Sequence, residues 1–171
     1  YTFDNSSSTE FWFQKGSSKS TFTATGGQLS QTGNTSISYF LVPDNTAVGD
    51  FTYEAEITSY DDDNFYLIWN YATNSNRDYV RFYGGNSAGM GNESIRWTGS
   101  GGVFYGLDWA TGDTLFVRIQ ITGGTGKVWA RNISKNGPLL LALSGTIDPA
   151  IHGTIGVASS WNSATNFDNL S

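Results

Sequence analysis

The stretch that decides the fold is TLFVRIQITGGTGKVWARNI, residues 114–133. Its first run alternates apolar with polar side chains, a period of two that is typical of a β-strand with one buried face. We expect the apolar members to point inward, namely Leu115, Val117, Ile119 and Ile121. The GGTG segment that follows, Gly123 to Gly126, predicts a tight hairpin turn.

The returning run, KVWARNI, places bulky side chains on the outer face. Alternation turns Val128 and Ala130 inward and leaves Lys127, Trp129 and Arg131 outward. Tryptophan beside arginine is unusual for a plain solvated face. This strand therefore indicates a surface that contacts something outside the fold.

Strand signals of this kind continue along the whole chain. Runs of β-branched and aromatic residues recur about a dozen times between clusters of Gly, Asn, Asp and Ser, and no helical period is found. Such short, regular spacing with only three prolines predicts an all-β fold, a two-sheet antiparallel β-sandwich of the jelly-roll kind. The length of 171 residues favours a single domain over residues 1–171.

Composition excludes several functions. Nine Lys and Arg against fifteen Asp and Glu give a net charge of −6, which disfavours nucleic acid as a partner. The chain has no cysteine, so it has neither a disulfide framework nor a thiolate metal site. No apolar stretch is long enough to insert into a membrane. A low-charge surface rich in Ser, Thr, Asn and Gly favours a secreted or extracellular domain, and Tyr1 as first residue suggests a removed targeting segment or an excised module.

The segment YDDDNFYLIWNYATNSNRDYVRFYGG, residues 60–85, divides by the same alternation into core and presented residues. The expected core members are Phe65, Leu67, Trp69, Val80 and Phe82. The expected presented members are Tyr71, Arg77, Arg81 and Tyr83.

Three landmarks carry a resemblance to a known family. They are TFDN leading to GGQLSQT, the block GDFTYEAEITSYDDDNFYLIWNYATNSNRDYVRFYGG, and the closing IDPAIHGTIGVASSWNSATNFDNLS. With these, the chain resembles the concanavalin A-like lectin and glucanase superfamily, in its laminin G-like and carbohydrate-binding-module forms. The resemblance implies a concanavalin A-like jelly roll, and this fold hosts lectins, hydrolases, lyases and adhesion modules.

Catalysis has a weak basis in the sequence. Glu54 and Glu56 share one strand face, but the resemblance implies an E-x-D-x-x-E strand in glucanases, and EAEITSYDDD does not reproduce it. The lone His152 has no companion for a metal site or a catalytic triad. We therefore expect no catalytic residues and no enzyme activity.

Arginine gives the sharpest functional signal. All five arginines fall between residues 77 and 131, and the four on expected strands point outward. The planar guanidinium suits carboxylate and sulfate groups, and exposed aromatic rings stack on sugars. The expected glycan-binding residues are Asn70, Tyr71, Arg77, Tyr79, Arg81, Tyr83, Trp109, Trp129, Arg131 and Trp161. The alternative is that some arginines pair with Glu54, Glu56 or Asp78 and that Trp69 and Trp97 belong to the core.

Two acidic sites are candidates for structural calcium. Asp61, Asp62 and Asp63 are three adjacent carboxylates in an expected turn, which is equally compatible with a solvated turn. Asp4 and Asp168 lie in the two FDN triplets near the ends of the chain and would approach one another if the first and last strands pair.

The sequence as a whole predicts a non-catalytic carbohydrate-binding module. We expect it to bind a polysaccharide or oligosaccharide, preferably anionic, as part of a larger secreted enzyme or adhesin. Two alternatives stay open at this point: a glycoside hydrolase or polysaccharide lyase of the same superfamily, and a calcium-dependent adhesion domain that binds protein.

Overall fold

The fold is described by a computed structural model of residues 1–171. It describes residues 13–16, 21–34, 36–42, 50–73, 75–84, 94–97, 102–146 and 154–171. These residues form fourteen strands and no helix. No helix in this part of the chain is therefore long and apolar enough to span a membrane.

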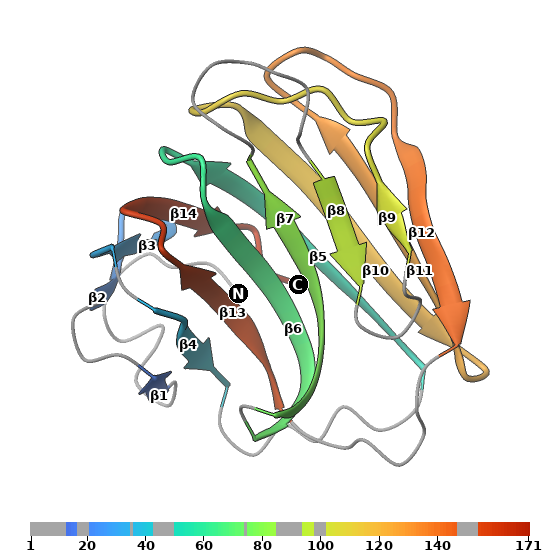
Figure 1. The fold of residues 1–171 in the computed structure, drawn as a ribbon, viewed down its shortest axis with the longest axis horizontal. Helices are drawn as coiled ribbons and strands as arrows, with labels where there is room; N and C mark the ends of the chain where they lie inside the picture. Colours follow the sequence, from blue (N-terminus) through green and yellow to red (C-terminus); the bar gives the residue numbers. More distant parts are fainter. Residues whose placement is uncertain are drawn as a thin grey trace.

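The strands form two antiparallel sheets of seven strands each. The first sheet runs in the order β1 (Phe13–Gly16), β4 (Ser38–Leu41), β13 (Thr154–Ser160), β6 (Asn64–Thr73), β7 (Asn76–Tyr83), β8 (Ser94–Trp97) and β9 (Val103–Phe104). The second runs in the order β12 (Leu140–Thr146), β11 (Thr125–Asn132), β10 (Thr114–Thr122), β5 (Phe51–Ser59), β14 (Ala164–Asp168), β3 (Gln28–Thr32) and β2 (Thr21–Thr25). Figure 1 views the molecule through both layers, with β9 and β12 along one side and β1 and β2 along the other. The predicted two-sheet sandwich is confirmed.

The hairpin at residues 114–133 forms as its sequence predicts. Strands β10 and β11 pair from Leu115 opposite Asn132 to Thr122 opposite Thr125. Gly123 and Gly124 make the turn with φ values of 56° and 78°, a left-handed conformation that glycine adopts without steric cost. Two adjacent positive φ values match the right-handed twist of the flanking strands. The turn therefore fixes the register that sends the apolar side chains inward.

One apolar core fills the space between the two sheets. All five core residues predicted in β6 and β7 belong to it, and each is at most 1% exposed. Phe65 and Phe82 stack with ring centroids 5.0 Å apart, and Trp69 meets Trp97 at 5.8 Å. The prediction that Trp69 and Trp97 are core residues is thus confirmed.

The pairing expected between the two ends of the chain involves the stretch around Asp4, which lies outside the described residues. Strand β1 lies at the edge of the first sheet beside β4, whereas β14 lies inside the second sheet between β3 and β5. The first described strand and the last strand therefore belong to different layers. Asp4 lies outside the described residues, so only Asp168 of that predicted calcium pair has a described position.

The first sheet also buries side chains on its outer face, which points away from the second sheet. This second cluster contains Tyr39, Leu41, Tyr66, Ile68, Tyr71 and Ala158. Because both faces of β4 and β6 are buried, their sequences read as continuous apolar runs, YFL and FYLIW, rather than as alternating ones.

Candidate functional site

The outer face of the first sheet gathers tyrosines and arginines from three strands. Tyr39 comes from β4, two tyrosines come from β6, and the remaining members come from β7. We call the set the tyrosine–arginine face, and it comprises Tyr39, Tyr66, Tyr71, Arg77, Tyr79 and Arg81. Register brings the strands together, because Tyr66 lies opposite Arg81 and Ile68 lies opposite Tyr79.

Arg77 is held between aromatic rings. Its guanidinium carbon lies 5.4 Å from the ring centroid of Tyr39 and 5.3 Å from that of Tyr79. The Tyr39 ring also meets Tyr71 at 4.9 Å. A cation over two ring faces is stabilised by their quadrupoles, so this packing fixes the orientation of the guanidinium.

A second arginine on the same strand contacts the tyrosines through a hydroxyl group. Arg81 and Ser160 both hydrogen-bond to the side chain of Tyr66. The Tyr66 ring packs edge-on against Tyr79 with centroids 5.5 Å apart. Arg77, Tyr79 and Arg81 therefore form one row along β7, because alternate residues of a strand share a face.

The hydroxyls of Tyr39, Tyr66 and Tyr71 on this face are protonated at neutral pH. Burial raises the pKa of Tyr39 to about 12, although the nearby Arg77 charge acts in the opposite direction. Burial also raises the pKa of Tyr66 and of Tyr71. The face thus offers hydroxyl and guanidinium donors together.

Several of these polar atoms have no hydrogen-bond partner among the residues that the structure describes. Tyr39 is 0% exposed, and among the described residues its hydroxyl has no hydrogen-bond partner. The buried Nε atoms of Arg77 and Arg81 are likewise unpaired in the described part of the chain. No carboxylate of the described residues forms an ion pair with either arginine. Buried donors without acceptors are costly, and these three atoms are unsatisfied polar groups of this face within the described residues.

The structure brings five of the predicted glycan-binding residues to this one face. Arg77, Tyr79, Arg81 and Tyr83 are half-buried there, as the alternation of β7 predicts. Tyr71 shares the face but is only 5% exposed, so its prediction as a presented residue is wrong, because its ring packs against Tyr39. Asn70 lies in β6, and its side chain is outside the described part of the structure.

Tyr39 and Tyr66 are members that the sequence analysis missed. Tyr39 reaches β6 only because β13 lies between β4 and β6, with Ala158 opposite both Tyr39 and Tyr66. That strand order joins segments more than a hundred residues apart and leaves no local trace. The signal available was the continuous apolar run in each strand, which indicates burial on both faces.

Trp129 and Arg131 lie on the opposite side of the molecule. They belong to β11, and both point to the outer face of the second sheet. The predicted glycan-binding residues therefore do not all share one surface, because β7 and β11 belong to different layers. The alternative of ion pairing holds for Arg118, whose Nε lies 2.5 Å from Oε1 of Glu54.

Two predicted tryptophans have opposite environments. Trp109 is 4% exposed and belongs to the core between the sheets, so its prediction as a binding residue is wrong. Trp161 is 57% exposed and follows β13 with a φ of 60°. A left-handed conformation is unfavourable for a bulky residue, and the exposed indole gains no burial in return.

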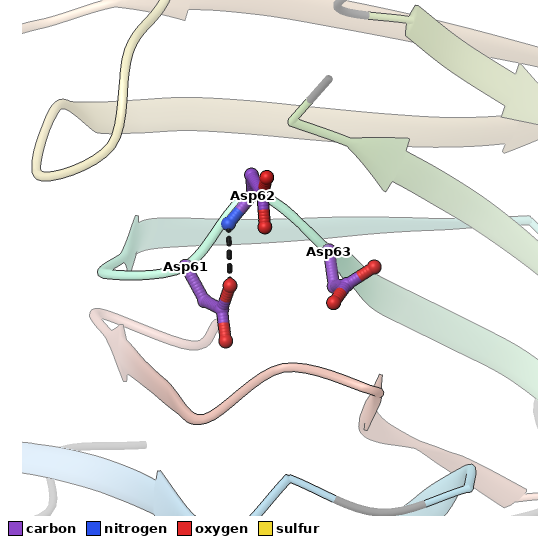
Figure 2. Close-up of side chains that lie close together, drawn as sticks. All are labelled: Asp61, Asp62 and Asp63. Carbon is purple, nitrogen blue, oxygen red and sulfur yellow. Dashed lines mark hydrogen bonds between the residues drawn. The ribbon is translucent and has the colours of Figure 1, made fainter. Parts of the chain in front are cut away.

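The acidic turn between β5 and β6 brings three carboxylates together. One oxygen from each of Asp61, Asp62 and Asp63 lies within 4.8 Å of the others (Figure 2). Burial raises the pKa of Asp63, and the charges of Asp61 and Asp62 raise it further. Hard oxygen ligands that repel one another in this way fit a calcium ion, whose charge would relieve the repulsion.

Asp61 also anchors the turn that follows β13. Its Oδ2 accepts a hydrogen bond from the backbone N–H of Ser163 at 2.7 Å, and its Oδ1 accepts one from Asp62 at 2.8 Å. Partial burial opposes ionisation, but these hydrogen bonds outweigh it and lower the pKa of Asp61. The buried Asn162 joins the same network by donating to Ser59 at 2.7 Å. Asp61 therefore links the turn after β5 to the turn after β13.

The class of fold follows from comparison with solved structures. No family model matches this chain, and no curated protein matches it. Solved structures do match over nearly its whole length, and they include a carbohydrate-binding module and several lectins. The protein has the concanavalin A-like lectin fold, which confirms the fold that the resemblance implied.

Three of these structures illustrate how similar the matching structures are to this chain in sequence and fold. The carbohydrate-binding module CBM66 from Bacillus subtilis is 16% identical with a TM-score of 0.60, over 94% of this chain and 93% of that one. Peanut lectin is 13% identical with a TM-score of 0.67, over 100% and 97%. The exoplasmic/lumenal domain of VIP36, in its Ca²⁺/Man-bound form, is 9% identical with a TM-score of 0.61, over 92% and 82%. Identities this low establish the fold alone.

Proposed function

We propose that this chain is a non-catalytic carbohydrate-binding module, and that the tyrosine–arginine face is its binding site. One observation carries the proposal: Arg77 is held between two tyrosine rings, with a buried Nε that has no acceptor in the described residues. Aromatic walls with a few converging polar groups are typical of small-ligand sites. Structures of similar fold include a carbohydrate-binding module and lectins, which supports the same conclusion.

The preferred ligand is an anionic polysaccharide or oligosaccharide, with uronate or sulfate groups. Arg77 and Arg81 supply positive charge, and neither has a carboxylate partner within the described part of the chain. A guanidinium binds carboxylate or sulfate through paired hydrogen bonds, and it does so more strongly where water is excluded. The half-buried row of Arg77, Tyr79, Arg81 and Tyr83 is the accessible side of the site.

We assign no catalytic role to the two glutamates of β5. Glu54 is engaged by Arg118, and both glutamates lie on the second sheet, away from the tyrosine–arginine face. The domain would act within a secreted or extracellular protein by holding other parts of it against a polysaccharide.

Calcium is proposed at the acidic turn rather than at the chain ends. The donor spacing at Asp61, Asp62 and Asp63 supports this choice, and the VIP36 domain of similar fold is known in a Ca²⁺-bound form. The ion would stabilise the turn between β5 and β6, and these three carboxylates would hold it.

Affinity electrophoresis in gels that contain uronate, sulfated or neutral polysaccharide tests the binding proposal. We expect retardation by an anionic polysaccharide, and at least a tenfold loss of affinity in Arg77→Gln and in Arg81→Gln. Lys127→Gln is the control, because it removes an exposed positive charge from the outer face of the opposite sheet. Unchanged retardation of both β7 variants, or equal retardation by neutral and anionic gels, would contradict the proposal.

A further inference from the structure

The outer face of the second sheet carries an ordered row of charges. Strand register aligns Arg131 with Phe116, Phe116 with Glu56, and Glu56 with Asp168. These residues lie on β11, β10, β5 and β14, which are consecutive strands of the sheet. The row therefore runs from positive, through an aromatic ring, to two negative residues.

A second row lies beside the first and has the same polarity. Register aligns Leu141 with Trp129, Trp129 with Arg118, and Arg118 with Glu54. Leu141 is 52% exposed. Positive charge thus occupies β10 and β11, negative charge occupies β5 and β14, and the boundary falls between β10 and β5.

Among the described residues of these two rows, one ion pair forms within the chain, and it lies at the boundary. Arg118 pairs with Glu54 at 2.5 Å. Arg131 stacks on the ring of Phe116 at 5.4 Å instead of pairing with a carboxylate. Among the described residues, Glu56 and Asp168 likewise have no ion pair. The unpaired charges of this row are therefore Arg131 at its positive end and Glu56 with Asp168 in its negative half.

We propose that this face binds a second copy of the same chain. A two-fold axis parallel to the strands, at the boundary between β10 and β5, would place the two faces against each other. The order of residues along each row would be reversed in the second copy. Arg131 of one copy would then face Asp168 of the other, twice by symmetry, and between these pairs each Phe116 ring would lie against Glu56 of the other copy. The half-buried rings of Phe116 and Trp129 supply apolar contact beside these charges.

The charge pattern favours a second copy over other occupants. A polyanion would meet Glu56 and Asp168, and a polycation would meet Arg131 and Lys127. Two copies with a net charge of −6 each repel at long range. At this face, however, the positive half of one copy would lie against the negative half of the other. This complementarity fixes how the two faces align. The dimer would leave a tyrosine–arginine face on each outer side, and would bind polymers with two sites.

Sedimentation velocity of the whole chain, over a range of protein and salt concentrations, tests this proposal. We expect a dimer at low salt that weakens as salt rises. Arg131→Asp and Asp168→Arg should each raise the dimer dissociation constant at least tenfold, and the double variant Arg131→Asp/Asp168→Arg should restore it. Thermal melting of each variant verifies the fold, and Arg131 is exposed, so its replacement leaves the core intact.

Three outcomes would overturn the proposal. The first is a monomer under all conditions. The second is a dimer that neither single variant weakens, which would place the contact elsewhere. The third is a monomer in which Arg131→Asp abolishes polysaccharide binding, which would make this face a glycan surface. None of these outcomes depends on the tyrosine–arginine face, because that face is tested separately with the variants Arg77→Gln and Arg81→Gln.

Discussion

At the scale of single residues, exposure separates tryptophans that stabilise the fold from those available for contact. Trp109 is 4% exposed within the core, whereas Trp161 is 57% exposed on the turn after β13. Both were expected at a binding rim. The sequence could not separate them, because each lies in a turn-rich stretch where no alternation assigns a face.

Replacement of these two tryptophans should have opposite effects on stability. Trp109→Ala should lower the free energy of unfolding by about 3–5 kcal/mol, because it leaves a cavity in the core. Trp161→Gly should leave that free energy unchanged or raise it, because glycine adopts a φ of 60° without strain. Urea unfolding of both variants measures the difference. Equal destabilisation would contradict the assigned environments.

The ionisation of Asp113 predicts how the stability of the domain changes at acid pH. Its Oδ2 accepts hydrogen bonds from the backbone N–H of Ala110 at 2.9 Å and from Nδ2 of Asn132 at 2.8 Å. Partial burial opposes ionisation, but these hydrogen bonds and Lys135 outweigh it, and the pKa of Asp113 is lowered. A lowered pKa stabilises the fold above the ordinary aspartate pKa of about 3.9, and the stabilisation is lost as the pH falls through the folded-state pKa.

The variant Asp113→Asn should therefore cost about 1–2 kcal/mol at neutral pH. The difference from the unmodified protein should shrink as the pH falls below about 4, since protonation removes the same charge. Urea unfolding at a series of pH values measures this convergence. Asp108→Asn serves as the control, because that carboxylate is 85% exposed and its ion pair with Lys135 contributes little. A difference that stays constant down to pH 2 would argue against the assigned role.

At the scale of elements, alternation was sufficient to locate strands and assign their faces. Strands β5, β10 and β11 bury the side chains that their patterns predict. Alternation does not assign the faces of a strand that is buried on both sides. Strand β4 is an example, because all four of its residues are buried, namely Ser38, Tyr39, Phe40 and Leu41. Alternation disappears there, and with it the evidence for a site on the outer face.

The turn between β5 and β6 tests the calcium assignment. Addition of Ca²⁺ should raise the melting temperature of the domain, because the ion would offset both the burial of Asp63 and its repulsion by Asp61 and Asp62, which together raise the pKa of Asp63. Asp63→Asn should abolish most of that rise, whereas Asp168→Asn should preserve it. The reverse pattern would indicate that the ion binds at Asp168, near the end of the chain. If Ca²⁺ does not raise the melting temperature, the turn is held by the hydrogen bonds of Asp61 alone.

At the scale of the whole molecule, the order of strands decides which residues share a surface. The arginines are close in sequence, yet the two sheets separate Arg77 and Arg81 from Arg118 and Arg131. Long-range pairing of β4 with β13, and of β13 with β6, assembles the tyrosine–arginine face. Sequence patterns predicted the sandwich and the row of the face that lies on β7, but the strand order that completes the face depends on packing between distant segments.

The central claim is that the tyrosine–arginine face binds an anionic glycan. Backbone amide NMR shifts, followed during titration with a uronate or sulfated oligosaccharide, test it most directly. We predict that the largest shifts fall on β6 and β7, from Ile68 to Tyr71 and from Arg77 to Arg81, and that they vanish in the Arg77→Gln variant. Shifts confined to β10 and β11, or to the turn at Trp161, would contradict the claim.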